Sequence, residues 1–182
     1  MRVIAGTARG RRLNAPRGSL ARPTTDRVKE ALFSILQGRL RGAVVCDLYA
    51  GSGALGIEAL SRGAARVTFI DSDRRAVDAI RANLDATGLD THAEVQQGVL
   101  PSALAAVAGP VDLVLADPPY DLPDDDLSDL LARAARLLAD GGIIVVERDR
   151  RSAPPTWPAE ASPREPRRYG DTTLHFAERL VA

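Results

Sequence analysis

The chain has 182 residues, of which 45% are hydrophobic and 26% charged, and its formal net charge is zero. This length and composition fit a protein whose core is large enough to fold unaided, and the single cysteine excludes a disulfide framework and a paired-cysteine metal site. No apolar run reaches the length of a membrane span and the first residues lack the apolar centre of a signal peptide, so we expect a cytoplasmic protein without a membrane or metal partner.

The charges are distributed unevenly along the chain. Residues 1–42 carry ten Lys or Arg against two acids, whereas residues 43–147 carry seven against seventeen. We therefore divide the chain into a basic N-terminal extension, residues 1–42, and a second unit, residues 43–182. A basic extension joined to an acidic core indicates that the extension meets a polyanion.

The extension contains two predicted elements. Residues 1–16, "MRVIAGTARGRRLNAP", are typical of a short hairpin because glycines mark its turns. The stretch "RPTTDRVKEALFSIL" predicts a helix capped at Thr24 or Thr25. The apolar stripe of this helix comprises Val28, Leu32, Ile35 and Leu36.

From Val44 onward, short apolar runs alternate with helical patterns, which is typical of parallel strands joined by crossover helices. The predicted strands are 44–48, 66–70, 93–97, 111–116 and 142–147. The predicted helices are 54–62, 73–87, 100–107 and 124–139, the last of them ended by Gly141 and Gly142. A proline-rich loop and a hairpin that turns at Gly170-Asp171 complete the chain.

One glycine-rich loop matches two kinds of cofactor site. In "VVCDLYAGSGALG", Gly51, Gly53 and Gly56 fit G-x-G-x-x-G, and Asp71 ends the next predicted strand. This pattern is typical of dinucleotide-binding dehydrogenases. A helix start offers free N–H groups to any anionic or polar cofactor, and Asp71 can accept ribose hydroxyls from either kind. The glycines alone therefore do not identify the ligand.

Asp47 favours S-adenosylmethionine over a dinucleotide. Its carboxylate precedes Gly51 by four residues, where it can accept hydrogen bonds from the ammonium group of a methionine moiety and would repel a pyrophosphate. Structural alternatives stay open at both acids: Asp47 can cap the turn that follows it, and Asp71 can cap the next helix, although Asp73 is also placed for that role.

The fourth predicted strand ends in Asp117-Pro118-Pro119-Tyr120. The two prolines restrict the backbone and remove two N–H donors, so the Asp117 carboxylate and the Pro118 carbonyl remain as acceptors. Such acceptors suit a planar exocyclic amine that must donate both hydrogens, and Tyr120 can stack on a base turned out of its helix. The alternative is a rigid turn with a packed tyrosine.

Two further residue types bear on the choice of chemistry. The two histidines, His92 and His175, are expected at the surface or at a sheet edge, so neither is placed for hydride transfer. Cys46 lies in an apolar run, which indicates a buried thiol without a covalent role. The residues therefore favour methyl transfer to an amine over dehydrogenase chemistry.

At these motifs the chain resembles a known family. The stretches "DLYAGSGALGIEALSRGA", "FIDSDRRAVDAIRANL" and "LADPPYD", with "GTARGRRL" and "RPTTDRVKEALF" before them, are similar to the bacterial RsmD family. Members of that family methylate the exocyclic N2 of a guanine in 16S ribosomal RNA. The resemblance implies an α/β fold, the class I S-adenosylmethionine-dependent methyltransferase sheet of seven strands with a reversed last strand.

The resemblance also implies roles for particular residues. The target guanine would be oriented by Asp117, Pro118, Pro119 and Tyr120, with Tyr120 standing where other members have Phe. The cofactor would contact Asp47, Gly51, Ser52, Gly53 and Asp71, with the backbone near Gly98 and Val99 facing its adenine. Thr24, Thr25 and Arg27 would line the cofactor pocket from outside the core.

The expected partner is 16S ribosomal RNA, within a partly or fully assembled small subunit, bound by a monomer. Phosphate contacts are expected from Arg9, Arg11 and Arg12 of the extension. Two alternatives stay open. An adenine-N6 methyltransferase of DNA or RNA would use the same Asp-Pro-Pro-Tyr motif, and a non-catalytic RNA-binding module would keep the fold without the chemistry.

Overall fold

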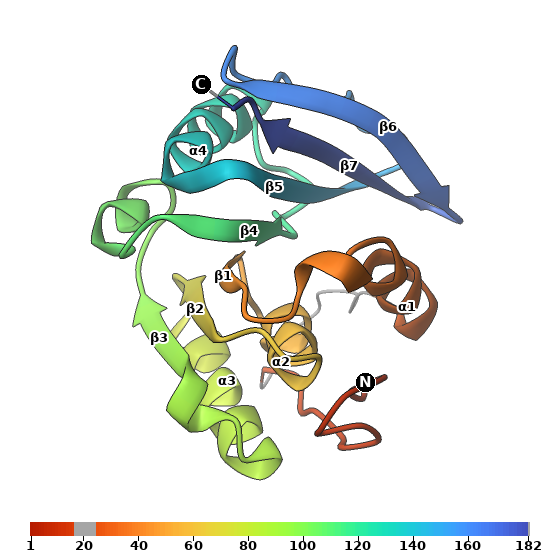
Figure 1. The fold of residues 1–182 in the computed structure, drawn as a ribbon, viewed down its shortest axis with the longest axis vertical. Helices are drawn as coiled ribbons and strands as arrows, with labels where there is room; N and C mark the ends of the chain where they lie inside the picture. Colours follow the sequence, from red (N-terminus) through yellow and green to blue (C-terminus); the bar gives the residue numbers. More distant parts are fainter. Residues whose placement is uncertain (17–24, 182) are drawn as a thin grey trace.

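The computed structural model describes residues 1–16 and 25–181. Its centre is a seven-stranded sheet in the order β3-β2-β1-β4-β5-β7-β6 (Figure 1). The strands are β1 (Val44–Leu48), β2 (Arg66–Asp71), β3 (Ala93–Gln97), β4 (Val111–Ala116), β5 (Leu138–Asp149), β6 (Ala161–Tyr169) and β7 (Thr172–Arg179). The first five are parallel, and β7 runs antiparallel to both β5 and β6. The predicted sheet with a reversed last strand is confirmed.

The helices follow the predicted order. They are α1 (Asp26–Ile35), α2 (Ala54–Ser61), α3 (Arg74–Thr87) and α4 (Asp124–Leu137), with short 3-10 helices η1 (Gln37–Arg39), η2 (Asp90–His92) and η3 (Ser102–Ala106). The predicted cap of α1 is confirmed at Thr25, whose hydroxyl accepts the Val28 N–H, while Thr24 lies outside the described residues. Asp73 caps α3 through the Arg75 N–H, and Gly88 ends that helix.

Two hydrophobic clusters cover the two faces of the sheet. Because side chains alternate along a strand, Val45 and Phe69 face one cluster while Cys46 and Ile70 face the other. The first cluster contains side chains of α1, α2, α3 and the N-terminal hairpin, and the second contains those of η3 and α4. The carboxyl ends of β1 and β4 lie where the strand order reverses, which is where open α/β sheets bind their ligands.

The N-terminal hairpin is anchored on α2 by a buried glutamate. One oxygen of Glu58 accepts the Ile4 N–H at 2.7 Å and the other accepts the Ala5 N–H at 3.0 Å. Lys29, a fully buried lysine on α1, lies 3.8 Å from Glu58 and donates to the Arg2 carbonyl. Glu58 therefore joins the hairpin, α1 and α2 in one polar cluster.

Glycine is required where the hairpin crosses α2. Gly6 has φ 84°, and a Cβ added there would lie 1.7 Å from the Ser61 carbonyl oxygen. The hairpin itself closes through an antiparallel bridge between Arg2 and Arg12, as the sequence predicts. The close contact fixes the hairpin against the helix that follows the glycine loop.

Four details of the sequence prediction are wrong. Ile35 is 47% exposed, whereas Phe33, which lies on the same helix, is fully buried in the core. The segment 100–107 forms only the five-residue η3, because Pro101 precedes it and removes an N–H donor. His175 is buried, since β7 is an inner strand. Finally, α4 ends at Leu137, before Gly141 and Gly142.

The end of α4 depends on a distant residue. Arg179 on β7 donates to the carbonyls of Ala135, Arg136 and Leu138 at the end of the helix, where the Ala135 carbonyl also accepts the Leu138 N–H. The chain then enters β5 at Leu138, so Gly141 and Gly142 lie inside a strand. A contact between residues some 40 positions apart leaves no local signal in the sequence.

Candidate active site

Four carboxylates stand at the carboxyl ends of four adjacent strands, in the order Asp71 (β2), Asp47 (β1), Asp117 (after β4) and Glu147 (β5). The alternation of side chains directs all four to the sheet face that α1 and α2 cover. Asp47 pairs in register with Phe69 and Leu115, so it lies two residues deeper than Asp71 and Asp117. The sheet thus brings together acids that the sequence separates by up to 100 positions.

The glycine loop has the geometry that its sequence requires. Gly51 and Gly53 adopt φ 57° and 77°, the left-handed region that favours glycine, and Gly53 caps α2. A Cβ on Gly56 would lie 2.3 Å from the Phe69 ring, so its absence lets α2 pack closely on β2. Asp71 accepts the Gly51 N–H at 2.9 Å, which fixes the loop against the end of β2.

Asp47 is 2% exposed, and one of its oxygens accepts the Gly56 N–H at 2.8 Å. Asp47 therefore caps the first turn of α2, which is the structural role that the sequence left open for it. Burial raises the pKa of Asp47 to about 8, helped by the nearby charges of Asp117 and Asp71 and opposed by the Gly56 hydrogen bond. A carboxylate that is costly to ionise in this position favours a cationic ligand.

Asn83 connects the glycine loop to the extension, a contact that the sequence reading missed. Its side-chain amide donates to the Ser52 carbonyl and to the Asn14 carbonyl, each at 2.9 Å. Its carbonyl accepts the Asn14 N–H at 2.9 Å. Asn83 is fully buried on α3, where its regular helical spacing gives no sign of these partners.

The end of β3 adjoins Asp71, as the sequence indicates for the adenine side of the cofactor. The Gly98 N–H donates to the Asp71 carbonyl at 3.0 Å. Val99 follows Gly98 and is 70% exposed. Contact of these two residues with a cofactor stays a prediction.

The Asp-Pro-Pro-Tyr segment leaves β4 next to the end of β1. The Asp117 N–H donates to the Leu48 carbonyl at 3.4 Å, and Asp117 itself is half-buried. Pro118 is buried, Pro119 is exposed, and Tyr120 is 61% exposed. A half-buried carboxylate beside an exposed aromatic ring matches the arrangement expected for holding an extruded base.

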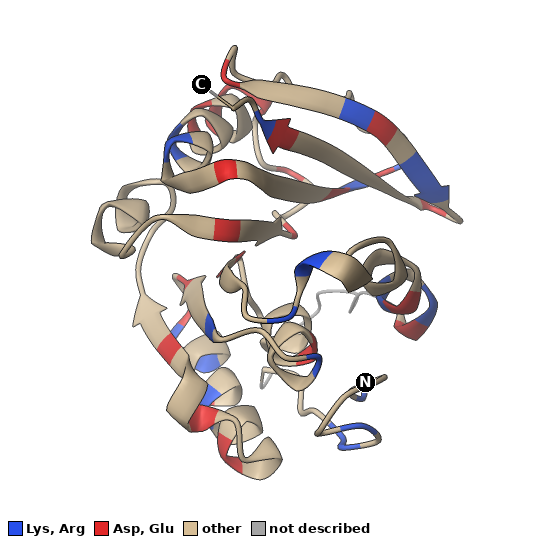
Figure 2. Cartoon of the chain, in the orientation of Figure 1, with Lys and Arg blue, Asp and Glu red and all other residues tan. Residues whose placement is uncertain are grey.

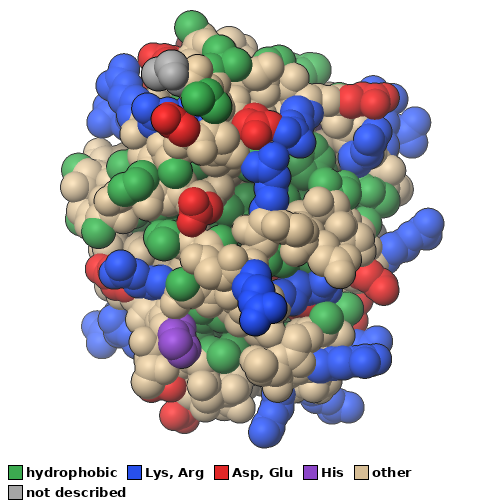
Figure 3. Space-filling view, viewed as in Figure 1, with side chains coloured by type: hydrophobic (Ala, Val, Ile, Leu, Met, Phe, Trp, Pro, Cys, Tyr) green, Lys and Arg blue, Asp and Glu red, His purple; other side chains and the backbone are tan. Residues whose placement is uncertain are grey.

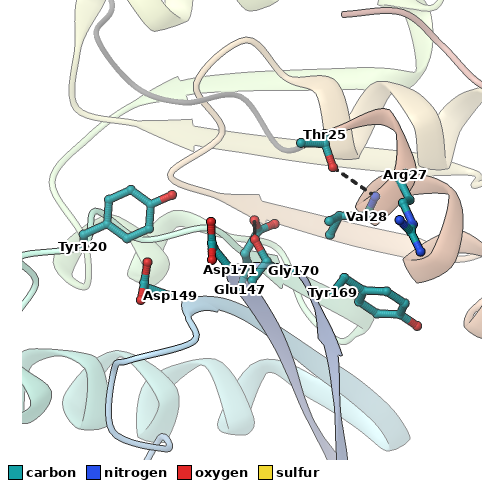
Figure 4. Close-up of a pocket in the computed structure, with 10 residues that line it drawn as sticks. Thr25, Arg27, Val28, Tyr120, Glu147, Asp149, Tyr169, Gly170 and Asp171 are labelled. Carbon is teal, nitrogen blue, oxygen red and sulfur yellow. Dashed lines mark hydrogen bonds between the residues drawn. The ribbon is translucent and has the colours of Figure 1, made fainter.

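A pocket of about 220 Å³ lies beside Tyr120 on the α1 side of the sheet (Figure 4). Its lining residues are Thr25, Arg27, Val28, Tyr120, Glu147, Asp149, Tyr169, Gly170, Asp171 and Thr172. Figure 4 shows Arg27 across the pocket from Tyr120, with the carboxylates of Asp149 and Asp171 between them. Thr25 and Arg27 thus lie together with the tyrosine, and their contact with a cofactor stays a prediction.

Basic side chains gather on the extension. Arg9, Arg11 and Arg12 are all exposed on the N-terminal hairpin, and Figure 2 shows basic positions along it and at the end of β6 next to the turn into β7. The space-filling view shows several Lys and Arg side chains projecting on the side where the hairpin lies (Figure 3). This surface suits a polyanion that would reach the strand ends from the hairpin side.

Two features are absent from residues 1–16 and 25–181. No group of three or more His, Cys, Asp or Glu side chains is placed to hold a metal ion. Within the same residues, no helix has the length and apolar character needed to cross a membrane.

Comparisons with known proteins agree on one family. A family model described as conserved hypothetical protein 95 matches residues 1–178. Ribosomal RNA small subunit methyltransferase D of Escherichia coli is 40% identical over 164 residues, which cover 89% of this chain and 81% of that protein. YlbH of Bacillus subtilis, named as a candidate rRNA methyltransferase, is 41% identical over 155 residues, which cover 82% of this chain and 83% of that protein.

A solved structure extends the likeness to the whole chain. A candidate methyltransferase of Escherichia coli, yhhF, superposes with a TM-score of 0.85 at 38% identity and covers 100% of this chain and 99% of that one. The likeness therefore includes the N-terminal hairpin and α1 as well as the sheet. It confirms the predicted class I methyltransferase fold.

Proposed function

The chain belongs to the family described as conserved hypothetical protein 95, and we propose that it transfers a methyl group from S-adenosylmethionine to the exocyclic N2 of a guanine in 16S ribosomal RNA. Relatives that share about 40% of its residues are named as rRNA methyltransferases, and methyl transfer to rRNA is the function it shares with them. One observation supports transfer to an exocyclic amine: Asp117 and Tyr120 stand at the strand end next to the glycine loop. The choice of guanine in the proposal follows the resemblance to the RsmD family.

The residues of the glycine loop fit S-adenosylmethionine. The buried Asp47 carboxylate suits the ammonium group. Asp71 ends the next strand, β2, and Gly98 and Val99 follow β3 one strand beyond it, where the ribose and adenine would extend. When bound, S-adenosylmethionine supplies an electrophilic methyl group on a positively charged sulfur. Ser52, Thr25 and Arg27 are proposed as further cofactor contacts.

The proposed reaction is direct transfer to the amine nitrogen, which would gain the methyl group as the S–CH3 bond of the cofactor breaks and would then release one proton to Asp117 or to water. Asp117 and the Pro118 carbonyl accept the two hydrogens of the amine, which turns its nitrogen toward tetrahedral geometry and directs the lone pair at the methyl group. The Asp117 carboxylate also stabilises the positive charge that develops on the nitrogen. Burial raises the pKa of the Cys46 thiol, so Cys46 supplies no thiolate for a covalent intermediate.

The proposed substrate context is a partly or fully assembled small ribosomal subunit, met by a monomer in the cytoplasm. The exposed arginines of the hairpin support RNA as the polyanion that the charge distribution indicates. The short extension also supports an assembled subunit, because its 42 residues present little surface with which to select one base in a large RNA.

The test is transfer of labelled methyl from S-adenosylmethionine to small subunits from cells that lack this protein, followed by nucleoside analysis. Label in N2-methylguanosine would support the cofactor, the base and the substrate together. Label in N6-methyladenosine would keep the chemistry and overturn the base. Absence of label from subunits, naked RNA and DNA, with cofactor binding intact, would favour a non-catalytic binding module.

Cofactor binding should depend on pH through Asp47. Because its pKa is raised to about 8, this carboxyl is mostly protonated at pH 7, whereas an ammonium ligand binds the ionised form. We expect binding at pH 7 to release close to one proton, and affinity to fall by up to about tenfold per pH unit below pH 8. Calorimetry in buffers of different ionisation enthalpy measures the released proton.

The Asp47→Asn variant is the control for this effect. Since the raised pKa means that ionised Asp47 destabilises the fold above its unfolded pKa of 3.8, the variant should lose no stability at pH 7 through its charge. Binding to the variant should be weaker and release no proton. Equal proton release by the variant and the wild type would assign the titration to another group.

The hairpin arginines should contribute uniform, salt-dependent RNA affinity. Replacing Arg9, Arg11 and Arg12 together with alanine should weaken binding to any rRNA fragment and reduce the slope of log affinity against log salt by about 2–3. A variant with Arg133 and Arg136 replaced, on α4 across the sheet, serves as the control. An unchanged slope in the triple variant would show that the hairpin does not meet phosphates.

A further inference from the structure

We propose that Glu147 selects guanine over adenine by accepting the N1–H of the target base. This inference rests on the proposed function, because it names the group that reads the base whose amine Asp117 holds. The Asp-Pro-Pro-Tyr motif accepts an amine and gives no reason to prefer guanine. The choice of base therefore requires a neighbour of Asp117 that reads the atom next to the amine.

Glu147 is that neighbour in the sheet. Ala116 of β4 pairs in register with Val146 of β5, so Asp117 and Glu147 follow at the same level on adjacent strands. Adjacent strands lie about 4.8 Å apart, which is the scale of one purine edge. Both side chains belong to the face that α1 covers, and Glu147 lines the pocket beside Tyr120 (Figure 4).

The two purines differ at the atom beside the amine. In guanine, the N2 amine is flanked by the N1–H, a hydrogen-bond donor, on one side and by N3, an acceptor, on the other. In adenine, the N6 amine is flanked by N1 and N7, and both are acceptors. A carboxylate accepts hydrogen bonds and donates none when ionised, so one placed beside the amine acceptor attracts guanine in the orientation that presents the N1–H, whereas it repels adenine in either orientation.

Burial makes Glu147 the strongest candidate among the acids of the pocket. Glu147 is 8% exposed, whereas Asp149 is half-buried and Asp171 is exposed, so water and salt screen Glu147 least. The Thr172 hydroxyl donates to one of its oxygens at 3.4 Å.

The strand order agrees with this assignment. From β2 to β5, the acids would meet in turn the ribose (Asp71), the ammonium group (Asp47), the target amine (Asp117) and the neighbouring ring nitrogen (Glu147). The cofactor would thus lie across β2 and β1, and the base would lie across β4 and β5. Each of the four ligand groups would thus contact one acid, and each acid lies at the end of a different strand.

The test compares guanine with 2-aminopurine at the methylated position. 2-Aminopurine keeps the amine at C2 but presents N1 as an acceptor. After the position is mapped with the natural substrate, ligated 16S rRNA that carries either base is assembled into small subunits, and kcat/KM is measured for each. The wild type should prefer guanine by roughly 10- to 100-fold, because 2-aminopurine leaves Glu147 facing a lone pair.

The Glu147→Gln variant adds a donor at nearly constant shape. Its amide can donate to N1 of 2-aminopurine and can still accept the N1–H of guanine through its oxygen, so the preference between the two bases should narrow toward unity, mainly through a gain in kcat/KM on 2-aminopurine. Asp125→Asn, the same charge change at an exposed position on α4, should keep the wild-type preference. Melting temperature and cofactor affinity confirm that both variants are folded.

The outcomes separate the two proposals. Wild-type transfer to guanine with an unchanged preference in Glu147→Gln would overturn the role of Glu147 and leave the proposed function standing. Equal use of both bases by the wild type would do the same, whatever the variant's folding. Label in N6-methyladenosine, or no transfer to guanine by the wild type, would overturn the proposed function and this inference with it.

Discussion

The Asp117→Ala variant is expected to lose methyl transfer by about 10²–10³-fold or more while it still binds S-adenosylmethionine. The amine of a base is a poor nucleophile because its lone pair is delocalised into the ring. Without the carboxylate, nothing in the proposed site accepts the amine hydrogens from the β4 side, and the charge that develops on the nitrogen is left unstabilised. Single-turnover transfer of labelled methyl to small subunits measures the loss.

Cofactor binding separates this catalytic effect from a structural one. Asp117 lies one strand away from the glycine loop, so calorimetry should find the affinity for S-adenosylmethionine within a few-fold of the wild type, or higher at neutral pH. The increase would arise because removing the Asp117 charge lowers the pKa of Asp47 and ionises it more readily. Near-wild-type turnover in Asp117→Ala would remove the basis for the proposed chemistry.

The parallel part of the fold follows from local patterns in the sequence. Buried parallel strands read as continuous apolar runs, so β1, β2 and β4 match their predicted ranges closely. The edge strand β3 also matches its range, although it is partly exposed and only Ala93 and Val95 in it are apolar. The helix caps at Thr25 and Asp73 are predictable for the same reason. Each cap consists of one side chain that accepts a backbone N–H no more than three residues further along the chain. Where the prediction fails, as at the end of α4, the deciding contact comes from Arg179 on another strand.

The sequence predicts three of the four acids individually, and it does not predict their arrangement. Asp47, Asp71 and Asp117 each follow or end an apolar run, which marks a strand end. Glu147 also ends such a run but lacks a motif, so the strand order is needed to place it beside Asp117. Tyr49, in the left-handed region at φ 55° between β1 and the glycine loop, has no sequence signal because that conformation normally marks glycine.

The buried cluster around Glu58 is beyond any reading of local sequence. Lys29 lies between Val28 and Glu30, and a lysine at such a position in a helix is normally expected to face solvent, yet its side chain is fully buried. Its partner Glu58 lies 29 positions further along the chain, and the hairpin residues that share Glu58 lie more than 50 positions before it. Such a cluster exists only once α1, α2 and the hairpin have packed together.

Glu58→Ala should therefore destabilise the protein by about 3–5 kcal/mol, since it leaves the Lys29 ammonium buried without its counter-charge. For a chain of this length the loss corresponds to a fall in melting temperature of roughly 6–20 °C. The N–H groups of Ile4 and Ala5 lose their acceptor at the same time, so the hairpin should exchange its amide hydrogens faster than the sheet. Glu30→Ala, an exposed glutamate on α1, should change stability by about 0.5 kcal/mol or less.

The pH dependence of this loss identifies the buried lysine as its source. Burial lowers the pKa of Lys29 and the Glu58 charge raises it again, so removing Glu58 lowers it further. A lysine whose folded pKa lies below its unfolded value of 10.5 opposes folding while it is protonated, and this opposition fades as the pH rises toward 10.5. The stability gap between Glu58→Ala and the wild type should therefore narrow with rising pH. Adding Lys29→Met should recover part of the loss at pH 7, whereas a gap that is constant with pH and unchanged in the double variant would assign the effect to the hairpin contacts alone.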